Sequence, residues 1–232
     1  MHGAKGGETD AKAPGRGAAR PAMAGGGMKG MDEEARRLWD AFAPRYDGAM
    51  DTVERLLFKG GREWVCARAG GAVVEVAIGT GRNLALYPPV ARLVGVEQSP
   101  AMLAVARRRA AALGVAADLR QGDAQALDLP DASADTVVFT LALCSIPDHR
   151  RALSEAARVL RAGGRLVLME HVRSPIAPVR WAERLLDPLA VRFQADHLLR
   201  DPVDDLPALG FEIEELRRSK LGLVELVSAR RA

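Results

Sequence analysis

The chain has 232 residues, a formal net charge of +3 and a hydrophobic fraction of 48%. This length suits one sizeable core, and no apolar run reaches the ~18 residues that a transmembrane helix needs. The N-terminus lacks an apolar signal-peptide core, and Glu8 and Asp10 argue against an organellar transit peptide, so we expect a cytoplasmic protein. Cys66 and Cys144 are too far apart for a C-x-x-C device, which argues against a disulfide framework and against a zinc site.

Residues 1–30 carry the whole excess of positive charge and are rich in Gly and Ala. Because they show no hydrophobic periodicity, we expect a disordered basic tail, with a functional basic arm as the alternative. Residues 31–232 are expected to form one domain, with a helical cap at 31–71 and an α/β core at 72–232. This body is charge-balanced and poor in aromatic residues, which argues against nucleic acid as a partner.

In the cap region, apolar side chains recur at helical spacing among charged residues. The pattern predicts an amphipathic helix that begins near Met31 and ends between Pro44 and Gly48. A second helix is expected at residues 51–58 and a third at 62–69, before Gly70-Gly71. The apolar stripe of the first helix consists of Leu38, Trp39, Phe42 and Tyr46.

Strand and helix patterns then alternate along the chain. Ser99 is a plausible N-cap and Pro100 a first helical residue for a helix that reaches Leu113 and stops at Gly114. Another helix is expected at 151–160, closed by residues 162–164. The expected strands are residues 73–77, 93–97, 118–121, 136–141 and 165–170. Strands separated by helices indicate right-handed crossovers and a mostly parallel sheet that is covered on both faces.

After His171 the pattern changes. Residues 179–193 form an amphipathic helical region interrupted by Pro188, which we interpret as core and pocket wall rather than membrane contact. Its apolar side chains are Trp181, Leu185, Leu186, Leu189 and Phe193. A short helix at 202–209 ends at Gly210. Two alternating runs, 211–216 and 221–229, predict an antiparallel hairpin at the sheet edge.

The run Val73 to Ala77 is followed by the turn Gly79-Thr80-Gly81. Glycine permits a tight turn and a close approach to a ligand, and a helix that begins after Gly81 would offer free N–H groups. An ordinary strand-to-helix turn is the alternative. Glu97 ends the next strand, at about the 20-residue separation typical of a carboxylate that binds ribose hydroxyls. A solvated strand end is the other interpretation of Glu97.

This geometry leaves dinucleotide dehydrogenases and S-adenosylmethionine enzymes as candidates. The dinucleotide fingerprint requires Gly or Ala at its third position, so that the helix can lie close under a pyrophosphate. That position is Leu84 here. A ligand without a phosphate is therefore favoured.

Four segments resemble successive motifs of class I S-adenosylmethionine-dependent methyltransferases. They are Glu75–Gly81 (EVAIGTG), Val96–Leu103 (VEQSPAML), Gln121–Ala124 (QGDA) and Val159–Arg165 (VLRAGGR). The resemblance runs from about Trp39 to the C-terminus and is strongest to quinone-ring C-methyltransferases and bacterial phospholipid N-methyltransferases. Leu143–Pro147 and Met169–Val172 also resemble methyltransferase-like thiol S-methyltransferases. The resemblance implies a Rossmann-like α/β fold with a seven-stranded, mostly parallel sheet, a C-terminal antiparallel hairpin and an N-terminal helical cap.

The resemblance also implies cofactor contacts. Glu75 would orient the methionine amino end, and Glu97 would bind the ribose hydroxyls. Asp123 would accept from the adenine amino group, unless it only caps the turn that follows it. Ala77 stands where the family usually has Gly, which would tighten or shift the methionine pocket. Further contacts are implied for Gly79, Gly81, Asn83, Gln98, Met102, Ala124 and Leu141–Leu143.

Methyl transfer from a sulfonium is an in-line displacement with dispersed charge, so proximity and alignment supply most of the acceleration. A general base is needed only when the acceptor holds a proton. His171, at the end of the last expected parallel strand, is the best-placed base, although a histidine there is often only structural. His149 and His197 are weaker candidates, and Tyr46 is a candidate from the cap.

We therefore predict an enzyme that moves a methyl group from S-adenosyl-L-methionine to a small, lipophilic acceptor. A quinone- or phenol-type carbon, a phospholipid amine and a thiol all fit the resemblance. The alternative is a non-catalytic S-adenosylmethionine-binding or partner module. No metal is expected, and membrane contact, where it occurs, is expected to be peripheral.

Overall fold

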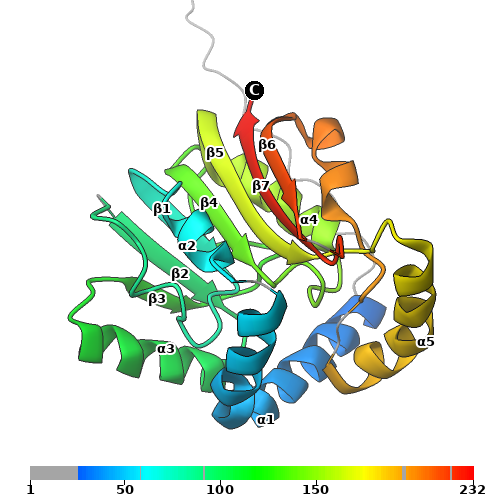
Figure 1. Cartoon of the computed structure of the whole chain (residues 1–232). Helices are drawn as coiled ribbons and strands as arrows, with labels where there is room; N and C mark the ends of the chain where they lie inside the picture. Colours follow the sequence, from blue (N-terminus) through cyan, green and yellow to red (C-terminus); the bar gives the residue numbers. More distant parts are fainter. Residues whose placement is uncertain (1–25, 58, 91, 195–196, 220) are drawn as a thin grey trace, which may run out of the picture.

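The computed structural model describes residues 26–232 except 58, 91, 195–196 and 220, and the expected tail at 1–25 lies outside the described residues. Within that part of the chain seven strands form one sheet in the order β3-β2-β1-β4-β5-β7-β6 (Figure 1). The strands are β1 (Ala72–Val76), β2 (Arg92–Glu97), β3 (Asp118–Gln121), β4 (Ala134–Thr140), β5 (Leu160–His171), β6 (Phe211–Arg218) and β7 (Val224–Arg231).

The pairing of the strands confirms the expected sheet. β1 pairs in parallel with β2 and β4, and β3 and β5 extend the parallel part on either side. β7 is antiparallel to both β5 and β6, which makes the C-terminal hairpin with β6 at the edge. Parallel strands end at the same side of the sheet, so the segments that follow β1, β2 and β4 come together there.

Both faces of the sheet are buried, as near-continuous apolar strands require. One core lies between the sheet, α4 (His149–Val159) and the 3-10 helices η1 (Pro202–Asp205) and η2 (Pro207–Leu209). It includes Val74, Phe139, Leu153, Leu168 and Leu206. The other lies between the sheet, α2 (Gly61–Cys66) and α3 (Pro100–Leu113), and includes Val65, Val73, Ala110, Val138 and Val167.

Local capping explains why α3 begins and ends where expected. The Ser99 hydroxyl accepts from the N–H of Met102, Pro100 is the first helical residue, and Gly114 follows the helix as its C-cap. These interactions satisfy backbone groups that a helix end leaves unpaired. The expected short helix at 202–209 is instead the two 3-10 turns η1 and η2.

The connection from β1 to β2 contains turns in place of the expected helix after Gly81. Three consecutive short-range bonds run from Gly81 N–H to Ile78 O (3.0 Å), from Leu84 N–H to Gly81 O (3.1 Å) and from Leu86 N–H to Asn83 O (2.8 Å). The prediction was wrong because the segment is short and ends at Pro88-Pro89, which cannot donate helical bonds. Within the described residues 77–90 of this connection, no helix begins after the Gly turn.

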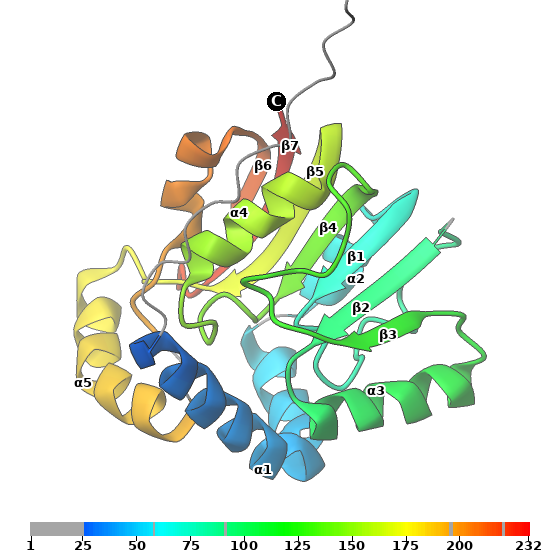
Figure 2. The same cartoon turned by 180° about the vertical axis from the view of Figure 1, so that it is seen from behind.

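The first helix of the cap is longer than predicted at both ends. α1 runs from Gly26 to Leu57 as one helix, with Pro44 inside it, so it begins within the expected tail and includes the expected second helix. Figures 1 and 2 both show it bent into a V, with its first part beside α5 (Ala177–Gln194), beyond the carboxyl ends of the parallel strands. A proline removes one N–H and crowds the preceding turn, which is the usual origin of such a bend.

α5 contradicts the interpretation that its apolar side chains are core. Trp181 is 64% exposed, and Leu185, Leu186 and Leu189 are each more than half exposed. The side chain of Phe193 lies outside the described residues. The helix instead turns Glu183 inward, where it is buried and accepts from the N–H of Ser174 at 3.0 Å. None of the described helices combines the length and the apolar content that crossing a bilayer requires.

Candidate functional site

Two small adjoining cavities, of about 60 and 50 Å³, lie where β1, β2 and β4 end. Four residues line both cavities: Trp39, Ala77, Glu97 and Ser145. The first cavity is also lined by Tyr46, Arg62, Glu75, Ile78, Gly79, Thr80, Arg82, Met102, Thr140, Leu141 and Ala142. The second is also lined by Val96, Gln98, Gly122, Asp123, Ala124, Gln125, Ile146 and Pro147. The structure thus brings together most of the residues that the sequence nominated.

Glu97 is held in place by backbone N–H groups. Its Oε2 accepts from Gly79 at 2.9 Å and its Oε1 accepts from Ser99 at 2.8 Å. Burial raises the pKa of this carboxyl, and the bonds to Ser99 and Gly79 partly offset that effect. Gly79 has φ of 60°, in the left-handed region that favours glycine, and this conformation belongs to the turn that donates to Glu97.

Glu75 is buried, with 2% of its surface exposed. Its Oε1 accepts from Asn83 Nδ2 and its Oε2 from the Tyr87 hydroxyl, both at 2.8 Å. Burial raises the pKa of Glu75 to about 7, against the opposing effects of Tyr87, Arg62 and Asn83. Asn83 also donates to Thr140 Oγ1 at 3.0 Å, which fixes Glu75 relative to β4. Contrary to the expectation of a cofactor contact, Asn83 lines neither of the two cavities.

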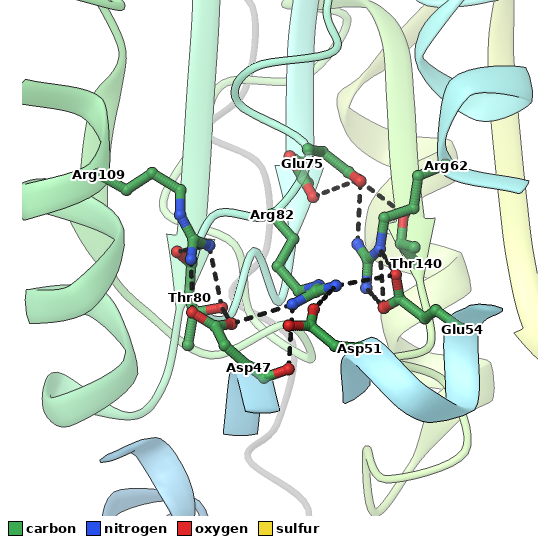
Figure 3. A network of polar contacts seen from close by, with 10 residues as sticks. Asp47, Asp51, Glu54, Arg62, Glu75, Thr80, Arg82, Arg109 and Thr140 are labelled. Carbon is green, nitrogen blue, oxygen red and sulfur yellow. Dashed lines mark hydrogen bonds and ion pairs between the residues drawn. The ribbon is translucent and has the colours of Figure 1, made fainter. Parts of the chain in front are cut away.

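Acidic residues of α1 attach the cap to this site (Figure 3). Asp47 accepts from the Thr80 hydroxyl at 2.7 Å and pairs with Arg109 of α3 at 2.5 Å. Arg82 pairs with Asp51 at 2.8 Å and Glu54 at 3.2 Å. Residues 47, 51 and 54 have the spacing of one helix face, so a single face of α1 covers the turn after β1.

Two further contacts complete the attachment of α1. Glu54 also pairs with Arg62 of α2 at 2.6 Å, and Arg62 in turn donates to Asn83 at 2.9 Å. Nearer its N-terminus, Asp40 accepts from the Ser99 hydroxyl at 2.5 Å. A wider cleft of about 600 Å³ lies beside the same arginines, but its charged, open lining holds none of the residues that the motifs nominated.

Aromatic side chains of α1 form the cap's contribution to the cavity walls. The rings of Trp39, Phe42 and Tyr46 contact one another with centroids 5.9–6.2 Å apart. Burial raises the pKa of Tyr46 to about 12, so its phenol stays neutral at physiological pH. Tyr46 was expected as a candidate from the cap. Trp39 was missed, although its place in the aromatic stripe marked it.

The loop after β4 is held by main-chain contacts from two sides. The buried Glu170 carboxylate accepts from the N–H groups of Ala142 (3.0 Å) and Leu143 (3.1 Å). Arg200 donates to the carbonyls of Leu143 at 2.8 Å and Ile146 at 2.5 Å. Leu143 is core rather than cavity lining, contrary to the expectation. Sequence analysis missed Glu170, although a carboxylate at the end of an apolar strand could have indicated its role.

Asp123 lines the second cavity and also caps the turn that follows it. Its Oδ1 accepts from the backbone N–H of Gln125 at 2.8 Å and from the Gln125 side chain at 3.1 Å. Gln98 and Ala124 line the same cavity, while Met102 lines the first one. The two interpretations of Asp123 are therefore compatible.

Ala77 and Gly81 have different places in the site. Ala77 lines both cavities and has φ of 54°, a left-handed conformation that costs an alanine about 1–2 kcal/mol and that glycine adopts without this cost. Gly81 lines neither cavity, contrary to expectation. A Cβ there would lie 2.6 Å from Leu84 and 3.2 Å from Ala106, so this glycine allows the turn to pack on α3.

The three candidate histidines lie outside the cavities formed by the described residues. His171 ends β5 and has Nε2 3.9 Å from Glu183 Oε1. His149 contacts Asp205 at 3.0 Å, and burial lowers its pKa. The backbone of His197 donates to Cys144 O at 3.0 Å. A base role for any of them stays a prediction. Cys66 and Cys144 are both buried, and neither forms a disulfide bond within the described residues.

Residues 74–168 match the family described as the methyltransferase domain. This stretch contains the turn after β1, Glu97, Asp123 and the loop after β4. It is a methyltransferase domain. This match and the relatives named below indicate a class I S-adenosylmethionine-dependent methyltransferase.

The named relatives of this methyltransferase domain act on different acceptors. A phosphatidylethanolamine N-methyltransferase of Cereibacter sphaeroides is 40% identical over 119 residues, covering 50% of this chain and 59% of that protein. A demethylmenaquinone methyltransferase of Thermus thermophilus is 36% identical over 150 residues, covering 60% and 66%. A human thiol S-methyltransferase is 31% identical over 166 residues, covering 69% and 65%. The chain spans about three fifths to two thirds of the length of these relatives.

A solved structure shows the same fold. It is an S-adenosylmethionine-dependent methyltransferase of Thermotoga maritima, described as a possible histamine N-methyltransferase. The TM-score is 0.66 at 22% identity, covering 84% of this chain and 99% of that one. The fold of the methyltransferase domain therefore agrees with the family that the sequence match gives.

Proposed function

We propose that this protein is an enzyme that transfers a methyl group from S-adenosylmethionine to a small, lipophilic acceptor. The observation that carries the proposal is the placement of three carboxylates around two adjoining cavities. Glu75 and Glu97 line the first cavity and Asp123 lines the second, in the chain order that the motifs of the family imply.

The chemistry of these groups fits the proposed cofactor. The Glu97 carboxylate accepts from three backbone N–H groups, and because its two oxygens together have about four lone-pair sites, it keeps acceptor capacity for the ribose. The buried Glu75 would be stabilised in its charged form by the amino group of the methionine part. Asp123 and the backbone of Ala124 would hold the adenine. Leu84 is buried in the core, and the described residues 82–90 that follow the Gly turn form turns and no helix. The free N–H groups of a helix N-terminus, which would bind a pyrophosphate, are therefore not provided by this segment.

When bound, the cofactor supplies a methyl group on a positively charged sulfur. The role of the protein is to align that group with the acceptor and to exclude water. Both depend on the side chains that line the cavity rather than on an acid or a base. Leu141 and Ala142 provide one wall after β4, and Trp39 and Tyr46 provide aromatic rings, which attract cations, from the cap. A neutral Tyr46 phenol can also donate a hydrogen bond to an acceptor oxygen.

The acceptor class follows from the apolar walls and from the relatives. Leu141, Ala142 and the ring of Trp39 give the first cavity its apolar walls. The named relatives act on a phospholipid amine, a menaquinone precursor and thiols. We therefore place the acceptor of this enzyme among lipophilic quinols or phenols, ethanolamine lipids and thiols.

Cofactor binding is tested by calorimetric titration with S-adenosylmethionine and its demethylated product. Asp123→Ala should weaken binding by about 1–3 kcal/mol, the loss expected when a donor of the bound cofactor is left without its acceptor. Asp128→Ala, at an exposed position in the same loop, is the matched control and should bind as the wild type does. Unchanged affinity in Asp123→Ala would remove this residue from the site, and no binding by the wild type would overturn the proposal.

Catalysis is tested by incubating the protein and labelled cofactor with panels of quinols, phenols, amines and thiols, and recording product masses. A methylated product names the acceptor class. Tight cofactor binding without turnover across the panels would instead favour the non-catalytic binding module.

A further inference from the structure

The outer surface of α5 is apolar. Trp181, Leu185 and Leu189 follow one another at intervals of four residues, so they form one stripe, and Leu186 widens it. Their exposed fractions are 64%, 57%, 54% and 54%, and Ile176, just before the helix, is 40% exposed. Single exposed leucines need no explanation, but a contiguous patch on one helix face marks an interaction surface.

On a helix that packs against a protein, the charged side chains usually face the solvent. In α5 the acidic side chains face the protein instead. Both acidic side chains bind the main chain of the protein. Glu183 is buried and accepts from the N–H of Ser174, and Asp187 accepts from the N–H of Leu198 at 2.8 Å. Arg184 is exposed and Arg180 is half-buried, so the charges bordering the apolar stripe are positive. A helix with an apolar outer face bordered by arginines is typical of segments that lie in the plane of an anionic membrane surface.

The position of α5 relates this surface to the site. The helix follows β5, whose His171 lies 3.9 Å from Glu183, and it packs beside the first part of α1, which carries the cavity-lining Trp39 (Figure 2). Both helices lie at the end of the sheet where the cavities are. A surface docked through α5 would therefore meet the protein on the side of the site.

We propose that the apolar stripe of α5, Trp181, Leu185, Leu186 and Leu189, docks this protein on anionic lipid bilayers. The leucines enter the acyl boundary, the Trp181 ring sits at the headgroup level, and Arg180 and Arg184 meet lipid phosphates. A second copy of the chain fits less well, because a two-fold contact between identical faces would oppose the same arginines. Access to a lipophilic acceptor rests on the proposed function, whereas docking itself does not.

The test is co-sedimentation of the full chain with vesicles of phosphatidylcholine, with and without phosphatidylglycerol. Wild type should bind the anionic vesicles and be partly released by high salt, since exposed charges are screened. Leu185→Glu combined with Leu189→Glu should weaken binding at least about tenfold, because two inserted leucines are lost. Leu113→Glu, at an exposed leucine on α3, is the matched control and should bind as wild type does.

Two further measurements keep the result interpretable. Trp181 fluorescence should shift to the blue on vesicles, and Trp181→Phe should lose that shift while it still sediments. Thermal melts and cofactor titration of the double variant should match wild type, which separates failure of docking from failure of folding or of the proposed function. Equal vesicle binding by the double variant and wild type would overturn the proposal. A wild-type dimer that the double variant breaks, without vesicle binding, would assign the stripe to a second copy and also overturn it.

Discussion

Replacing Glu75 by Gln should stabilise the fold at alkaline pH while it weakens cofactor binding. The substitution keeps the shape and both hydrogen bonds, because the amide oxygen can still accept from Asn83 and the Tyr87 hydroxyl can turn to accept from the new NH₂ group. It removes only a buried charge. In the wild type that charge is unfavourable, since burial raises the pKa of Glu75 from 4.5 to about 7.

The magnitude follows from linkage. A shift from 4.5 to about 7 corresponds to about 3 kcal/mol. Because the folded-state pKa is raised, the stabilising contribution of protonated Glu75 is complete below pH 4.5 and is lost as the pH rises through 7. The wild type should therefore be less stable than Glu75→Gln by about 3 kcal/mol at pH 8, and the two should converge near pH 4.5.

Urea unfolding of both proteins at several pH values measures this difference. Burial also raises the pKa of Glu225, to about 7, and the pKa of Glu97, so the wild-type profile contains several groups, and only the difference between the proteins reports Glu75. Glu212→Gln, at an exposed position on β6, controls for the loss of one negative charge. Calorimetry should show at least about tenfold weaker cofactor binding by Glu75→Gln, as expected for a lost charge-assisted hydrogen bond. A variant less stable than wild type at pH 8, or a difference independent of pH, would refute this account of Glu75.

Three further changes test the turn after β1 and the cap. Ala77→Gly should change the free energy of unfolding by less than about 1 kcal/mol, because the variant loses the strain of a left-handed alanine but gives up more conformational entropy on folding. Titration should show that the variant binds the cofactor more tightly than the wild type. Gly81→Ala should destabilise the fold by about 2–3 kcal/mol in urea unfolding, since its Cβ would meet Leu84 and Ala106; a wild-type midpoint would contradict this. Arg82→Met removes the ion pairs of Arg82 with Asp51 and Glu54, so stopped-flow should show severalfold faster cofactor release, and an unchanged rate would mean that α1 does not restrict exit.

Sequence reasoning succeeded where local chemistry decides the structure. Ser99, Pro100 and Gly114 defined the ends of α3, and Glu97 followed from its place at the end of β2. These features depend on a few neighbouring residues and on the common edge where parallel strands end. The parallel strands and the C-terminal hairpin followed from the alternation patterns, and the family resemblance implied the seven-stranded sheet.

Prediction from the sequence failed where contacts between residues far apart in the chain determine the structure. A proline within α1 predicted a break, but the helix continues with a bend, and its second part is held by Arg82 and Arg109, which are remote in sequence. Periodicity identified α5 but not which face turns inward, because the burial of Glu183 depends on a backbone N–H from a preceding loop. The role of Arg200 was invisible for the same reason, since its partners are carbonyls of residues more than 50 positions away.

The loop after β4 has a consequence for how such proteins diversify. Glu170 and Arg200 grip it through peptide groups, which every substitution except proline at an N–H position leaves intact. The side chains of Ser145, Ile146 and Pro147 can therefore change identity while the path of the chain stays fixed. Evolution can change the ligand contacts at these positions without rebuilding the scaffold, and a library confined to them would let an experimenter do the same.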